Sequence, residues 1–319
     1  MRSNTVQPEN SMNILDDILS TLNLKGTLYF RTDLSPPWAV TVPNLEQAAR
    51  FHLCVQGTCL VGFENGEYAE LKPGDLILIP RGRSHTLSCT PVDEAPPLET
   101  VLSDAGYDGR GVLVVGKGDR NASTQLICGH FTLRDGADHP LLRALPDYLL
   151  TCSATRAREV WLDEVLRLLT RRMFSEGDIA EATITRLSEV CFIELLRLGV
   201  GSTPEMASIL TALTDRQIGK ALQLMHREAD KPWTVGSLAS EVGMSRSSFA
   251  DRFRELMGMG PMSYLSEWRL QKALSLLEDT GCSVQQAAAG TGYQSPAAFT
   301  RAFTTRFGYS PRELKRKAG

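Results

Sequence analysis

Short apolar runs alternate with turn-forming residues over the first part of the chain. Glycine, proline and asparagine separate these runs, as in Asn65-Gly66 and Pro73-Gly74. The runs are Thr27–Phe30, Phe51–Val55, Cys59–Phe63, Leu76–Ile79, Thr86–Cys89, Val112–Val115 and Gln125–Cys128. This spacing predicts an all-β sandwich or barrel. The Pro- and Gly-containing stretch 90–110 is expected to be a loop on that domain.

The pattern changes after Pro140, where apolar residues recur every three or four positions. This period predicts helices over 159–173 and 178–198, and a shorter one between Ile14 and Leu22. Gly and Pro break the pattern at 199–204, and everything after Glu205 is again helical. The chain is therefore expected to divide into a disordered tail at 1–13, a β-domain at 14–150, a helical segment at 151–200 and an all-α domain at 205–319.

The all-α domain contains one pattern twice. The first copy has Leu238-Ala239, Gly243, Phe249, Phe253, Gly258 and Pro261, and the second has Ala287-Ala288, Gly292, Phe299, Phe303, Gly308 and Pro311. Such a repeat indicates two duplicated structural units. Each copy fits a helix-turn-helix, in which a glycine with positive φ ends the first helix and a serine, Ser245 or Ser295, begins the second. The paired phenylalanines would anchor the second helix to a core.

This domain resembles the AraC/XylS family of transcription regulators over residues 207–317. The resemblance is carried by Gly292-Tyr293-Gln294-Ser295, Phe299-Thr-Arg301-Ala-Phe303 and Phe307-Gly308-Tyr-Ser-Pro311. It implies that Pro261–Glu278 is a linker helix holding two recognition helices one DNA turn apart. The candidate recognition helices are Arg246–Arg254 and Pro296–Thr305.

Side chains away from the phenylalanine faces are the candidate DNA contacts. They are Arg246, Ser247, Ala250, Asp251, Arg254, Pro296, Ala297, Thr300, Arg301 and Thr304. The resemblance places base reading on Ser247, Ala250, Asp251, Ala297, Thr300 and Arg301. An arginine such as Arg301 suits a guanine, and Thr300 suits a thymine methyl group. Asp251 has two interpretations, a contact to cytosine N4 or an ion pair with Arg252 or Arg254.

A second resemblance lies in the β-domain. Gly74-x5-Pro80-x-Gly82-x2-His85 matches the second motif of the cupin β-barrel, with Cys89 where asparagine is common. The first motif is degenerate and reads His52-Leu53-Cys54, followed by Cys59. Together with Cys128-Gly129-His130-Phe131 and His139-Pro-Leu-Leu, these residues resemble the cupin-type sensor domains that precede AraC-like units. That resemblance covers about residues 14–200.

Closure of the barrel as in cupins would bring together His52, Cys54, Cys59 and His85, with Cys89 on the same strand face as His85. Three interpretations are open. Two imidazoles and two thiolates suit zinc; a thiolate beside a cationic histidine suits redox sensing; and small buried side chains also fill cores without any chemistry. An anionic small ligand is a further candidate, because the positively charged side chains of Arg31, Arg81 and Arg83 could bind it.

Charge and composition change this picture little. The net charge of −3 is split unevenly: Glu205–Gly319 carry 15 Lys and Arg against 11 Asp and Glu, and the rest of the chain is acidic. A basic second half suits DNA binding. Seven cysteines argue against a disulfide framework. No signal peptide or membrane-spanning run is visible, so we expect a cytoplasmic protein.

These observations predict an α+β multidomain protein, with a cupin-like β-barrel, flanking helices and a double helix-turn-helix domain. The predicted function is a sequence-specific transcription regulator, an activator rather than an enzyme, controlled by a small ligand, a metal such as zinc or thiol oxidation. Its expected partners are an operator in double-stranded DNA, RNA polymerase and, in a homodimer, a second copy; a monomer is the alternative. Competing hypotheses are a cupin metalloenzyme fused to a DNA-binding domain and a constitutive DNA-binding dimer with a structural barrel.

Overall fold

The computed structural model of the chain describes residues 14, 17–21, 23–45, 48–117, 122–153, 160–174, 181–198 and 203–318. They form two compact units. The first, here called the sheet unit, holds the described residues of Leu24–Leu133 and Leu145–Ser202. The second, the helical unit, holds those of Met1–Asn23, Arg134–Ala144 and Thr203–Gly319. The tail predicted at 1–13 lies outside the described residues.

Two sheets make up most of the sheet unit. The larger has the strand order β10 (Leu149–Thr151), β6 (Leu76–Ile79), β3 (Ala48–Gln56), β9 (Gln125–Thr132), β1 (Lys25–Leu34) and β8 (Val112–Val115). The smaller has the order β2 (Ala39–Val42), β7 (His85–Ser88), β4 (Cys59–Gly62) and β5 (Tyr68–Leu71). Neighbouring strands are antiparallel except for β1 and β8, which are parallel.

The core of this unit lies between the two sheets. Leu34, Ile77 and Leu126 come from the larger sheet, and Val61 and Leu87 from the smaller one. Every strand predicted from an apolar run is present, so the sheet-rich cupin-like fold is confirmed. Three short strands, β2, β5 and β10, were not predicted, and the expected loop at 90–110 contains helix α2 (Leu98–Asp104).

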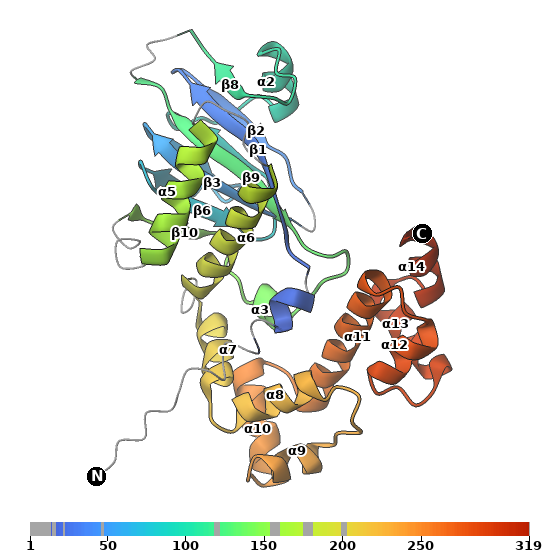
Figure 1. Cartoon of the computed structure of the whole chain (residues 1–319). Coiled ribbons are helices and arrows are strands. Elements are labelled where there is room, and N and C mark those ends of the chain that lie inside the picture. The colour runs from blue at the N-terminus through green and yellow to red at the C-terminus, as the bar shows by residue number, and fades with distance from the viewer. Residues whose placement is uncertain are drawn as a thin grey trace, which may run out of the picture. The chain divides into compact units, whose positions relative to one another are not determined.

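Helices α5 (Val160–Phe174) and α6 (Glu181–Leu198) complete the sheet unit beside the larger sheet (Figure 1). The backbone N–H of Gly26 donates to Glu189 of α6 at 3.4 Å, and the rings of Phe131 and Phe192 lie 4.8 Å apart. A Cβ atom at Gly26 would lie 2.2 Å from the Ser188 hydroxyl oxygen, so glycine permits this close approach. The two predicted helices are thus present within the described residues.

The helical unit contains the predicted double helix-turn-helix. Its helices are α7 (Pro204–Thr214), α8 (Ile218–Arg227), α9 (Val235–Glu241), α10 (Arg246–Met257), α11 (Pro261–Asp279), α12 (Val284–Gly290), α13 (Pro296–Phe307) and α14 (Pro311–Ala318). Short helical pieces at 17–21 and α3 (Pro140–Arg143) belong to the same unit. Among the helices that the structure describes, none is both long and apolar enough to cross a membrane.

Candidate nucleic-acid interface and interior cavity

The first helix-turn-helix is built from α9 and α10. Thr234 and Ser237 form a capping box that begins α9, and the Ser245 hydroxyl begins α10 by accepting from the Ser248 N–H. Gly243 in the turn has φ +69°, in the left-handed region where glycine is favoured. Both Phe249 and its neighbour one turn on, Phe253, are fully buried, so the opposite face of α10 is left toward solvent.

The second unit repeats this arrangement with α12 and α13. Ser283 and Gln286 form its capping box, and Ser295 caps α13 by accepting from the Ala298 N–H at 3.4 Å. Phe299 and Phe303 are fully buried. The glycine here, Gly292, has φ +77°. The sequence therefore predicted the glycine turns, the caps Ser245 and Ser295 and the buried phenylalanine faces of both units correctly, whereas the capping boxes of α9 and α12 were not predicted.

Most candidate DNA contacts lie on the exposed faces of these two helices. Ala250 and Thr300 are half-buried, and the other eight are exposed: Arg246, Ser247, Asp251, Arg254, Pro296, Ala297, Arg301 and Thr304. The Asp251 carboxylate lies 3.6 Å from Arg254, which is one of its two predicted interpretations. Arg252 instead pairs with Asp215 at 2.7 Å. Arg301 makes no hydrogen bond or ion pair with another described residue, so its guanidinium is available to a ligand.

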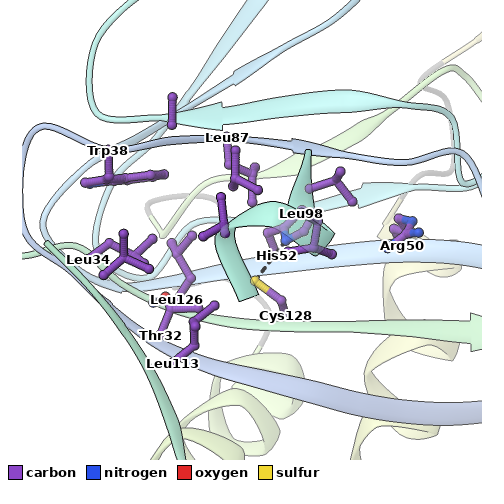
Figure 2. A pocket seen from close by; sticks show the side chains of 15 residues that line it. Thr32, Leu34, Trp38, Arg50, His52, Leu87, Leu98, Leu113, Leu126 and Cys128 are labelled. Atoms are coloured by element: carbon purple, nitrogen blue, oxygen red, sulfur yellow. Dashed lines mark hydrogen bonds between the residues drawn. The ribbon is translucent and has the colours of Figure 1, made fainter. Parts of the chain in front are cut away.

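A small cavity of about 40 Å³ lies in the sheet unit and is lined mainly by apolar side chains (Figure 2). Trp38, Leu87 and Leu126 form part of its wall. The polar side chains in the wall are Thr32, Arg50, His52 and Cys128. Arg50 and His52 are both buried, so the cavity combines an apolar wall with buried polar groups.

A chain of hydrogen bonds joins three residues beside this cavity. The Nδ1 atom of His85 lies 2.8 Å from the Arg83 carbonyl oxygen, so this nitrogen carries the proton and donates. The other ring nitrogen, Nε2, then accepts from His52 Nε2 at 2.8 Å, which leaves His52 Nδ1 to accept from the Cys128 thiol at 3.0 Å. This assignment satisfies all three groups in their neutral forms.

The pKa values agree with that assignment. Burial, the neighbouring His85 and Arg50 hold the pKa of His52 well below its ordinary value, and burial lowers the pKa of His85 to about 4. Burial also raises the pKa of Cys128 to about 12. Both imidazoles and the thiol are therefore neutral near pH 7.

The remaining predicted sensor residues lie close by but make separate contacts. The thiol of Cys54 lies 3.5 Å from the carbonyl oxygen of Gly57, that of Cys59 lies 3.6 Å from the carbonyl oxygen of Leu60, and that of Cys89 lies 3.4 Å from the carbonyl oxygen of Trp38. Burial raises the pKa of Cys54 to about 12 and that of Cys59 well above its ordinary value. Thiols in this state are poor nucleophiles.

The residues do not form a zinc site in this arrangement. Within the described part of the chain, no group of three or more His, Cys, Asp or Glu side chains has a geometry that could hold a metal ion. The ring nitrogens of His52 and His85 already bond to each other, so their lone pairs are not directed at a common point. Sequence reasoning missed Cys128 as the partner of His52, although the register of β3 on β9 places them side by side.

Comparisons with known proteins agree with both resemblances. A family model described as Cupin matches residues 13–200, and one described as a helix-turn-helix domain matches residues 238–317. A putative AraC-like transcription regulator of Streptomyces antibioticus is 30% identical over 310 residues, 96% of this chain and 99% of that protein. The RCS-specific transcriptional activator RclR of Escherichia coli is 28% identical over 308 residues, 96% of this chain and 98% of that protein.

Among the solved structures similar to part of the chain is one of a DNA-binding domain. The crystal structure of the DNA-binding domain of AdpA, in complex with a target DNA, is 30% identical where it matches. The match covers 33% of this chain and 93% of that one, with a TM-score of 0.31. The relatives that span this chain nearly end to end thus carry names of transcription regulators, and a cupin domain stands in front of the helix-turn-helix domain here.

Proposed function

Because the chain belongs to the AraC-like family of DNA-binding transcription regulators with a cupin domain, we propose that α10 and α13 are its recognition helices. Each would enter a major groove with its exposed face, and α11 would hold them at the spacing of two neighbouring grooves. The observation that supports this most is the duplicated capped helix following a positive-φ glycine, with phenylalanines on one face and exposed side chains on the other. Residues 205–319 would be the DNA-binding domain.

In this proposal the ten candidate contacts divide by chemistry. Arg301 would donate to O6 and N7 of a guanine, and Thr300 would touch a thymine methyl group. Arg246 and Arg254 would bind phosphate and set position. Asp251, which lies beside Arg254, would orient that arginine rather than read cytosine.

Replacing Arg301 with alanine should cost about 1–3 kcal/mol of binding to the preferred sequence and relax selection at one base pair. The reason is that the Arg301 guanidinium can donate two hydrogen bonds to one guanine, whereas the alanine side chain can donate none. The measurement is in vitro selection from random duplexes, followed by titration at fixed salt. Arg312→Ala is the control, because Arg312 is an exposed arginine of the same unit outside both recognition helices. Unchanged sequence preference in the Arg301 variant would show that α13 does not read bases.

We propose that the part of residues 14–150 that lies in the sheet unit forms a sensor domain whose effector occupies the interior cavity. The wall favours a small, mostly apolar molecule with one hydrogen-bonding or anionic group, because apolar side chains surround buried Arg50 and His52. The present volume of about 40 Å³ holds only a few atoms, so binding would widen the space between the sheets. Two competing proposals concern the same interior: zinc held by His52, Cys54, Cys59 and His85, and oxidation of Cys54, Cys59 or Cys89.

Native mass spectrometry of the full-length protein separates these three proposals. With benzoate and benzyl alcohol as probes, we expect one bound molecule per chain, and no binding to Ala39→Phe, whose added ring fills the cavity. A mass excess of zinc that disappears in Cys54→Ser would instead support the metal. A mass lower by two hydrogen atoms after mild oxidation, with both electrons passed to the added oxidant, would support a disulfide-forming thiol switch. Raised thiol pKa values and the neutral His52–His85 chain are the reasons for preferring the small molecule.

We propose further that residues 151–200 mediate a homodimer. Trp161 on α5 is 75% exposed, and Val160 and Leu168 of the same helix are also exposed, an arrangement that a second copy would cover. The same mass spectra report the dimer directly. Such a dimer would act in the cytoplasm, where it would contact RNA polymerase and activate transcription without enzymatic activity of its own. Footprinting beside a promoter, combined with an in vitro transcription assay, tests that role.

A further inference from the structure

Residues Arg134–Ala144, here called the brace, belong to the helical unit although strands of the sheet unit flank them along the chain. Strand β9 ends at Thr132, two residues before the brace, and β10 begins at Leu149, after it. Within the helical unit the brace lies against α11, the helix that joins the two helix-turn-helix units. The brace makes three sets of contacts, with α11, with the core beneath α10 and with α13.

The first set fastens the beginning of the brace to the end of α11. The Arg134 side chain is 1% exposed and pairs with Glu278 and with Asp279, the latter at 2.6 Å. Its Nε atom donates to the Thr21 carbonyl oxygen at 3.2 Å. The amide of Gln271 donates to the Gly136 carbonyl oxygen at 3.0 Å. Because the buried Arg134 side chain makes several charge-assisted hydrogen bonds, it fixes the brace along the second half of α11.

The second set reaches the core beneath the first recognition helix. The Nε2 atom of His139 lies 3.1 Å from the Tyr264 hydroxyl, and its Nδ1 atom accepts from the Leu141 N–H to begin α3. Tyr264 is buried on α11 and lies against Phe253 of α10, with 5.7 Å between ring centroids. The brace therefore touches the aromatic core that carries α10.

The third set reaches the second recognition helix. Asp138 forms an ion pair with Arg306 in the last turn of α13 and another with Arg143 at 3.0 Å. Arg143 in turn pairs with Glu267 of α11. Gly136 lies so close to Phe307 that a Cβ atom there would stand 2.9 Å from the ring. Ion pairs thus run without interruption from α13 through the brace to the first half of α11.

We propose that the brace sets the orientation of the second recognition helix relative to the first, with Asp138 as the positioning residue. This inference rests on the proposed function, since orientation matters only if both helices bind one duplex. Two linked modules bind a double site more tightly than a single site only when their geometry matches it.

The test uses a duplex selected from random sequence by the full-length protein, and two derivatives with either subsite scrambled. We expect Asp138→Asn to weaken binding to the intact duplex by about threefold to tenfold, with unchanged binding to each single-subsite duplex. The control is Asp147→Asn, because Asp147 forms comparable exposed ion pairs with Arg81 and Arg83 in the sheet unit. That variant should bind all three duplexes like the unmodified protein.

Arg306→Gln and the double variant complete the experiment. A positioning role predicts that Arg306→Gln resembles Asp138→Asn and that combining them causes no further loss. Tighter binding by Asp138→Asn with weaker binding by Arg306→Gln would overturn the inference, because it would mean that Asp138 only withholds Arg306 from phosphate. Equal loss on intact and single-subsite duplexes would also overturn it. Failure to select any duplex would instead overturn the proposed DNA recognition itself.

Discussion

Gly292→Ala should destabilise the helical unit by about 3 kcal/mol, whereas Gly243→Ala at the equivalent position of the first repeat should cost about 1 kcal/mol. Both glycines have positive φ, +77° and +69°, so both substitutions strain the backbone. Only Gly292 is also crowded. A Cβ atom there would lie 2.8 Å and 2.9 Å from the carbonyl oxygens of Asp230 and Ala229, and 2.7 Å from the guanidinium of Arg269. A Cβ atom at Gly243 would meet no other described residue within 4 Å, apart from its two neighbours along the chain.

Relief of this crowding is difficult because the neighbours are fixed. Arg269 donates to the Ala229 carbonyl oxygen at 2.7 Å and to the Lys231 carbonyl oxygen at 2.6 Å. Moving the arginine would break both bonds. Hydrogen exchange of amides in α10 and α13, read by mass spectrometry, gives the free energy of opening of each helix-turn-helix unit. Equal protection losses in the two variants would contradict the role of close packing at Gly292.

These two glycines show what the repeat did and did not predict. The pattern placed Gly243 and Gly292 in equivalent turns, and the structure confirms the positive φ of both. The pattern could not show that only Gly292 packs against the chain after α8, because that contact joins the two repeats. Local periodicity predicts the packing within one helix-turn-helix repeat, whereas contacts between the two repeats depend on the path of the chain in space.

The sheet unit shows the same limit. Apolar runs located seven strands, but in β2, β5 and β10 buried residues alternate with more exposed ones, so a search for continuous apolar runs did not find these three. His52, Cys54, Cys59 and His85 lie in the interior, as the two motifs predicted, whereas Cys89 is half-buried. Their partners were not predicted, since the bond between His52 and Cys128 depends on the register of β3 on β9. The brace was missed because its residues look like an ordinary connection between strands.

Acidification from pH 7.5 to 5.5 should destabilise both units, through histidines that are buried in their neutral form. Burial lowers the pKa of all five histidines, which are the fully buried His52 and His85 and the half-buried His130 in the sheet unit, and the fully buried His139 and His226 in the helical unit. Their unfolded pKa is about 6.5. The unfolded chain therefore takes up protons below that pH while the folded chain does not. Stability is complete above pH 6.5 and is lost as the pH falls through the unfolded pKa.

The size of the loss follows from the same linkage. A histidine whose folded pKa lies below 5.5 contributes a loss of about 1.4 kcal/mol between pH 7.5 and 5.5, so two such groups give about 3 kcal/mol in one unit. The pKa of His85 near 4 meets that condition, and that of His52 lies well below its ordinary value. In the helical unit His226 is partly offset by Asp17, whose carboxylate lies 3.8 Å from its ring. We therefore expect the larger loss in the sheet unit.

His139→Asn isolates one of these groups. Asparagine is a good N-cap, so it can replace the imidazole that accepts from the Leu141 N–H at the start of α3. The variant should lower the stability of the helical unit at pH 7.5, because the bond to Tyr264 is lost, but that stability should fall less between pH 7.5 and 5.5 than in the unmodified protein, because one histidine that burial keeps neutral is gone. The sheet unit of the same molecule serves as the internal control. Hydrogen exchange at both pH values, corrected for the intrinsic exchange rate, measures this. A pH dependence of the helical unit equal to that of the unmodified protein would mean that His139 is not held neutral in the folded state.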